Sequence, residues 1–344
     1  MRSLSNSFTG RATLGGSWVK PIAGLLLVLI GIQLSGCGGG GDGQADGEKK
    51  YRIAVIPKGA THQFWQSVHY GAQQAADELG NVEIEWQSPS VESDTRSQIE
   101  MVKNMVTNQV DGIVLAPNHQ GSLVDAVLEA NDASIPVVIF DSGLDDGAEI
   151  VTYVATDNRN GGRMAAKRLA EALGEQGKVI LLRYKEGSES TNQREEGFLE
   201  EIANYSGIEV VSSNEYGGDS TGSAKEKVQQ LLLKHGEATG LFAVCESNAN
   251  GALEAILEAG KAGEIQFVGF DPSERLEEAL KEGHCQGVVL QDPVKMGYES
   301  VKAVVAHLKG ETVDTYINTG EFIATGDTLD DEEIDRLLHP PTKK

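Results

Sequence analysis

From Tyr51 onward, the chain alternates short apolar runs rich in β-branched residues with longer segments of helical periodicity. This alternation is typical of parallel sheets, because two successive parallel strands must be joined by a crossover that is usually a helix. Strands are predicted at residues 52–57, 82–86, 112–116, 137–140, 179–182, 209–212, 241–244, 266–270 and 288–290, with helices at 63–79, 94–108 and 122–131. Several runs are apolar at every position, which indicates burial on both faces of a sheet. Because the series restarts after Tyr153, we expect two similar doubly wound α/β lobes.

The first fifty residues have a different composition. Three basic residues, Arg2, Arg11 and Lys20, precede an apolar run at 22–32, which is too short for a transmembrane helix of about 20 residues but fits a signal-peptide core. The sequence Leu-Ser-Gly-Cys that ends at Cys37 resembles the lipobox of bacterial lipoproteins. It predicts a signal peptide at 1–36, a lipid on Cys37 and a flexible glycine-rich linker at 37–50. The alternative is an uncleaved anchor with a chance cysteine.

Charge and cysteine content limit the partners. The chain has 52 acidic and 29 basic side chains, a formal charge of -23, so a nucleic acid backbone would be repelled. Two further cysteines remain, Cys245 and Cys285. They could form one disulfide in an oxidising compartment, or they could be two small buried side chains.

Polar residues recur where the predicted strands end. In an open parallel sheet, the ligand crevice lies beyond the carboxyl ends of the strands, so these residues should converge on one cleft. They follow the strands as Lys58 to Gln63, Asp141-Ser142, Arg183 to Glu186, Cys245 to Asn248, Asp271 and Gln291-Asp292.

Seven segments, in this order, resemble the ribose-binding type of periplasmic binding protein, the type I pentose and hexose binding proteins of bacterial ABC importers. They are Phe64-Trp65, 111–114, 135–141, 155–158 with Gly161-Gly162, 194–198, 269–271 and 291–293. The resemblance implies two hinge-connected, Rossmann-like lobes, each a parallel sheet with helices on both faces. It also implies three crossovers, near Ala155, Gln291 and Gly320. The N-terminal lobe would then comprise 51–155 plus 292–320 and the C-terminal lobe 156–291 plus 321–338, followed by a tail at 339–344.

The resemblance also implies a set of ligand contacts. A sugar has apolar C–H faces that stack on aromatic rings and hydroxyls that both donate and accept hydrogen bonds. Phe64 and Trp65 would supply the faces, and Asp141 and Asp271 the charged acceptors. The other candidates are Lys58, His62, Ser142, Asn192, Arg194, Glu246 and Gln291.

Structural roles compete with several of these assignments. Phe64 begins the apolar stripe of its helix and could belong to the core, whereas Trp65 stands off that stripe. Asp141 and Asp271 could cap the helices that follow them. Gly161 and Gly162 lack the spacing of a dinucleotide fingerprint and are expected to permit close helix packing.

Two positions depart from the family pattern. Ser142 stands where the family's sugar binders often have arginine, and Cys245-Glu246 replaces an Asn-Asp pair. Together with the added Lys58, these departures suggest a modified sugar, a polyol or a charged small molecule.

The sequence therefore predicts a monomeric, lipid-anchored solute-binding protein of the cell envelope that delivers a monosaccharide or sugar derivative to an ABC permease. The alternative is a subunit that presents a sugar or autoinducer-like signal to a membrane receptor. A sugar-responsive repressor is not expected, because the N-terminal segment reads as a signal and a tether. We expect no enzymatic activity, cofactor, metal or nucleic acid, since no nucleophile elbow, phosphate loop or metal-spaced histidine cluster is recognisable.

Overall fold

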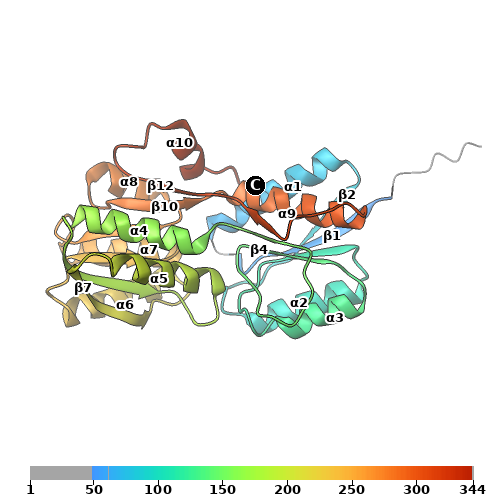
Figure 1. The fold of residues 1–344 in the computed structure, drawn as a ribbon, viewed down its shortest axis with the longest axis horizontal. Helices are drawn as coiled ribbons and strands as arrows, with labels where there is room; N and C mark the ends of the chain where they lie inside the picture. The colour runs from blue at the N-terminus through green and yellow to red at the C-terminus, as the bar shows by residue number, and fades with distance from the viewer. Residues whose placement is uncertain (1–48, 61, 343–344) are drawn as a thin grey trace, which may run out of the picture. The chain divides into compact units, whose positions relative to one another are not determined.

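The computed structural model describes residues 49–60 and 62–342. They form two six-stranded sheets, each with helices packed against it (Figure 1). The strand orders are β11-β5-β4-β3-β1-β2 and β12-β10-β9-β8-β6-β7. The strands of the first sheet are β1 (Tyr51–Ile56), β2 (Val82–Trp86), β3 (Gly112–Leu115), β4 (Val137–Phe140), β5 (Tyr153–Ala155) and β11 (Tyr316–Asn318). Those of the second are β6 (Gln176–Arg183), β7 (Gly207–Tyr216), β8 (Gly240–Ala243), β9 (Gln266–Phe270), β10 (Gly287–Gln291) and β12 (Glu321–Ala324). The prediction of two α/β lobes, each built on its own sheet, is confirmed.

Four helices cover the first sheet: α1 (Gln63–Leu79), α2 (Thr95–Thr107), α3 (Val124–Asp132) and α9 (Pro293–Leu308). Residues of β1 alternate between its two faces, as the pleat of a strand requires. Ile53 and Val55 pack in the same cluster as α1 and α9, whereas Ala54 and Ile56 pack with α2 and α3. Both faces of the sheet are therefore buried.

Six helices accompany the second sheet: α4 (Asn158–Ala172), α5 (Glu189–Ile202), α6 (Thr221–Lys234), α7 (Glu246–Glu258), α8 (Glu274–Glu282) and α10 (Glu332–Leu338). One apolar cluster joins the sheet to α4 and α5, and another joins it to the other four helices. We call each sheet with its helices a lobe, the first containing β1 and the second containing β6.

The chain passes between the sheets three times: after Ala155, after Gln291 and between Asn318 and Glu321. The last passage explains one difference from the expectation that each sheet is wholly parallel. The strand β12 is antiparallel to its neighbour β10, whereas all other pairs are parallel. Since β11 leads directly into β12 from the end where the other strands of the second sheet finish, β12 must run away from that end.

Glycines bring two helix pairs into backbone contact, α1 with α9 and α4 with α5. A Cβ added at Gly71 would lie 1.9 Å from the carbonyl oxygen of Val294, and one at Gly162 would lie 2.0 Å from that of Arg194. The expected packing role of Gly162 is confirmed. Its neighbour Gly161 faces the ring of Phe270 instead, and a Cβ added there would lie 3.1 Å from the nearest ring atoms.

Within the described residues, none of the helices is both long and apolar enough to cross a membrane. The predicted signal peptide, the lipidation of Cys37 and most of the linker fall outside this part of the chain, as do the last two residues of the predicted tail.

Candidate ligand-binding site

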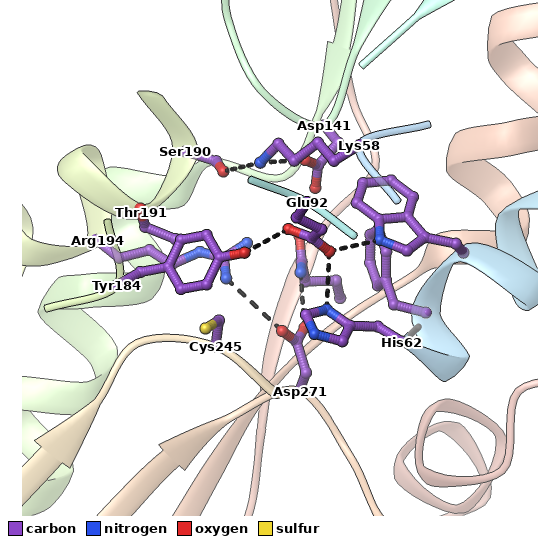
Figure 2. Close-up of a pocket in the computed structure, with 13 residues that line it drawn as sticks. Lys58, His62, Glu92, Asp141, Tyr184, Ser190, Thr191, Arg194, Cys245 and Asp271 are labelled. Atoms are coloured by element: carbon purple, nitrogen blue, oxygen red, sulfur yellow. Dashed lines mark hydrogen bonds and ion pairs between the residues drawn. The ribbon is translucent and has the colours of Figure 1, made fainter. Parts of the chain in front are cut away.

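A pocket lies between the two lobes, at the carboxyl ends of the strands (Figure 2). Its empty volume is about 340 Å³ when the open solvent at its mouth is counted. The first lobe lines it with Lys58, His62, Phe64, Trp65, Glu92 and Asp141, and the second with Tyr184, Ser190, Thr191, Arg194, Cys245, Asp271 and Gln291.

A buried ion pair joins the ends of β1 and β4. Lys58 Nζ lies 2.8 Å from Asp141 Oδ2, and each side chain is only 4% exposed. Lys58 Nζ also donates to Ser190 Oγ of the second lobe at 3.0 Å. Asp141 adopts a left-handed backbone conformation, with φ of 60°, which aspartate tolerates better than most residues.

Glu92 lies in the connection between β2 and α2, and its carboxylate reaches the centre of the pocket (Figure 2). Oε1 accepts a hydrogen bond from Trp65 Nε1 at 2.7 Å and lies 2.8 Å from His62 Nδ1. Oε2 accepts from the hydroxyl of Tyr184 of the second lobe at 2.7 Å. Burial alone would raise the pKa of Glu92, but His62, Lys58 and Tyr184 favour the charged form and hold the pKa well below its ordinary value.

The charge of Glu92 in turn keeps His62 protonated. Burial by itself would lower the pKa of His62, but attraction and hydrogen bonding by Glu92, with smaller contributions from Glu246 and Asp271, raise it to about 9. At neutral pH, His62 and Glu92 therefore form a buried pair of opposite charges.

Arg194, Asp271 and Gln291 form a polar group on the second lobe. Asp271 Oδ1 accepts from Gln291 Nε2 at 2.7 Å, and Arg194 Nη1 lies 3.7 Å from Asp271 Oδ2. The guanidinium is held by the side chain of Asn158 and by the ring of Phe270, whose centroid lies 3.7 Å away. Burial raises the pKa of Asp271, although Arg194 and Gln291 oppose the shift.

Phe64 and Trp65 both line the pocket while belonging to the core of the first lobe. Their rings meet edge to face with centroids 4.8 Å apart, and Trp65 also contacts Phe140 edge to face. The core and ligand interpretations of Phe64 are therefore compatible, because the helix begins at the pocket rim.

Three candidates lie outside the pocket lining. Ser142 Oγ accepts a hydrogen bond from the backbone N–H of Ser190 and so joins the two lobes. Asn192 precedes Arg194 by two residues on α5 and points elsewhere, because residues two apart on a helix do not share a face. Burial raises the pKa of Glu246 to about 7, although His62 and the backbone N–H groups at the start of α1 oppose the shift. Its carboxyl group thus lies at that helix terminus rather than in the pocket.

Several lining residues were not among the candidates. Tyr184 stands directly after β6, in a strand-end segment that was expected at the cleft but was not chosen as a ligand contact. Ser190 and Thr191 lie in the first turn of α5, and this position at a helix end could have indicated them. Glu92 comes six residues after β2 ends, which is too far for a search restricted to the first residues after each strand.

Neither Cys245 nor Cys285 forms a disulfide, and both are buried. Burial raises the pKa of each thiol to about 12. The interpretation as small buried side chains is confirmed, although Cys245 also lines the pocket.

Two α/β lobes that each direct charged, hydroxyl and aromatic groups into one shared pocket define a bilobal small-molecule binding protein. Residues 53–312 match the family model of the periplasmic binding protein domain. The chain belongs to this family, with the type I fold.

Known relatives agree with this assignment. The ribose import binding protein of Salmonella typhimurium is 30% identical over 269 residues, which are 78% of this chain and 88% of the relative. An ABC transporter solute-binding protein from Agrobacterium vitis, solved with bound D-fucose, is 35% identical with a TM-score of 0.81, over 84% of this chain and all of that one. A carbohydrate transporter solute-binding protein from Agrobacterium radiobacter, in complex with D-arabinose, is 31% identical with a TM-score of 0.81, over 84% of this chain and 99% of that one.

Proposed function

We propose that this protein is the extracytoplasmic solute-binding component of an ABC importer and that its ligand is a monosaccharide or a close derivative. The observation that carries the proposal is the pocket itself, which is lined by acceptors, donors and aromatic rings from both lobes. Relatives named for ribose import, and neighbours solved with D-fucose and D-arabinose, support the same ligand class.

The proposed ligand contacts follow from the chemistry of the lining. Asp141 and Asp271 present charged acceptors for ligand hydroxyls, and Arg194 presents guanidinium donors. Gln291 Oε1 is buried without a hydrogen-bond partner among the described residues. A ligand hydroxyl that donates to this oxygen would satisfy it, which adds a reason to place Gln291 in the site.

Binding acts through lobe closure. Besides the Glu92–Tyr184 and Lys58–Ser190 contacts, the backbone N–H of Gly143 in the first lobe donates to Glu189 Oε2 in the second at 2.7 Å. A ligand that touches both lobes stabilises the closed form, in which these contacts exist. The free energy of this stabilisation equals the difference between the binding free energies of the ligand for the closed and open forms. We take the three chain passages between the sheets as the hinge, and the closed outer surface as the feature that a permease recognises.

The same proposal places the protein at the cell envelope as a monomer, held to a membrane by lipid on Cys37, with no catalytic step and no cofactor. The name of the family, the periplasmic binding protein domain, supports a location outside the cytoplasm. Lipidation rests on the residues that precede Cys37.

A sugar panel tests the proposal. We expect thermal unfolding of the purified protein to shift upward with at least one pentose, hexose or polyol, since a ligand at a hundredfold excess over its Kd adds about 2.7 kcal/mol to stability. Asp271→Asn, which suits the left-handed backbone at this position, should weaken calorimetric affinity by about tenfold or more. Asp111→Asn, at the opposite end of the first sheet, is the matched control. Absence of any sugar response in the wild type would contradict the proposal.

A further inference from the structure

We propose that Glu92 is a specificity-determining residue, whose carboxylate accepts a hydrogen bond from a hydroxyl of an uncharged ligand and disfavours anionic analogues of that ligand. This inference rests on the proposed function, because it concerns which sugar-like molecules the same pocket accepts.

The first argument is the hydrogen bonding of the carboxylate. A carboxylate offers about four acceptor positions on its two oxygens. Trp65 and His62 occupy two of them at Oε1, and Tyr184 occupies one at Oε2. One position on Oε2 is left in a group that lines the pocket and is 4% exposed, so a ligand hydroxyl can complete the set.

The second argument is the rigidity of the group. Three donors from two lobes fix both oxygens, and Gly59 packs against the side chain so closely that a Cβ there would lie 2.7 Å from Glu92 Cγ. A carboxylate held in this way cannot rotate away from a ligand that brings a negative charge close to it. Rigid polar groups discriminate strongly, because a mismatched ligand leaves them without a partner.

The third argument is the charge balance of the lining. Its three basic side chains are Lys58, His62 and Arg194, and its three acidic side chains are Glu92, Asp141 and Asp271. Each base lies within 4 Å of one acid, so the lining can hold an uncharged ligand without unpaired charge. An anionic ligand would add a negative charge beside Glu92 in a site that excludes most solvent.

Neutralising Glu92 removes the negative charge beside which an anionic ligand would lie. In Glu92→Gln, His62 would also lose the partner that raises its pKa, so the net charge of the lining would stay balanced while this local repulsion is lost. The pocket should then tolerate a carboxylate on the ligand better while losing a charged acceptor for the hydroxyl.

The test compares the best-bound neutral sugar of the panel with the matching uronic acid, by titration calorimetry at pH 7. In the wild type, we expect the neutral sugar to bind at least tenfold more tightly. In Glu92→Gln, this preference should fall by about tenfold, the scale of one charge-assisted hydrogen bond. Glu85→Gln is the matched control, because Glu85 lies on β2, pairs with Arg52 outside the pocket and should leave the preference unchanged.

Glu92→Asp keeps the test informative if the glutamine variant does not fold. Its shorter side chain retains the charge, so binding of the neutral sugar should weaken while the preference over the uronic acid persists. Equal binding of both ligands by the wild type, or an unchanged preference in Glu92→Gln, would overturn the inference without affecting the proposed function. Failure of every sugar to bind the wild type would instead overturn both.

Discussion

Removing one partner of the Lys58–Asp141 ion pair should strongly reduce both stability and ligand binding. The two groups follow β1 and β4 of the same lobe, so the pair itself does not join the lobes, and each group is 4% exposed in this structure. Replacing Lys58 by Met keeps most of the side-chain volume but leaves the carboxylate of Asp141 buried without its counter-ion.

The expected magnitude follows from the cost of an unpaired buried charge. Removing one partner of a buried ion pair typically costs about 3–5 kcal/mol of the free energy of unfolding, whereas removing both costs much less. We therefore expect Lys58→Met to lose about 3–5 kcal/mol. The double variant Lys58→Met with Asp141→Asn should recover at least half of that loss, because the amide is neutral and asparagine also tolerates the left-handed backbone.

Urea unfolding of the two single variants and the double variant, followed by circular dichroism, measures this coupling. The reasoning predicts that the double variant is more stable than the sum of the single losses by about 2 kcal/mol or more. Additive losses would refute it and would show that the pair is not energetically coupled. Ligand affinity should fall in all three variants, since both residues line the pocket.

Three further predictions concern pH, helix packing and closure. The pKa of His62 is raised from 6.5 to about 9, so the stability that its charge contributes is complete below pH 6.5 and is lost as pH rises toward 9. In urea unfolding, the difference in stability between wild type and His62→Gln should therefore narrow by on the order of 2–3 kcal/mol over that window. A difference that stays constant with pH would argue against the charged pair. Gly162→Ala should cost at least 1–3 kcal/mol, because its Cβ would meet a carbonyl of the facing helix, whereas Gly222→Ala, which has open space around it, should be neutral or stabilising in the same thermal unfolding assay. Glu189→Ala removes the interlobe hydrogen bond that Glu189 accepts from the backbone N–H of Gly143. The Kd for the ligand should rise by about three- to tenfold, and small-angle scattering should show a more open average form. An unchanged scattering profile would count against a role of Glu189 in closure.

The alternation of apolar runs and helical segments determined the fold class. Consecutive apolar residues such as 137–140 are buried on both faces in the structure, because a parallel strand has helices on each side. The same pattern did not reveal the short strands β5, β11 and β12, which lie at or next to the passages between the sheets. Strands of three or four residues are too short to show a period.

The strand-end rule located most of the candidate site. Lys58, Asp141, Asp271 and Gln291 were expected at the cleft and line it, because the carboxyl ends of parallel strands share one edge of a sheet. The rule could not assign partners, however, since pairing depends on which strands are neighbours.

The sequence by itself therefore determined the number of lobes, the edge of each sheet that faces the ligand and the kinds of side chain present there. Only the tertiary structure decided that Glu92 reaches the pocket centre and meets His62, Trp65 and Tyr184. The physical reason is that periodicity reports contacts within one element and with its sheet. These contacts instead join a long connection to both lobes, and Tyr184 lies 92 residues after Glu92 in the chain.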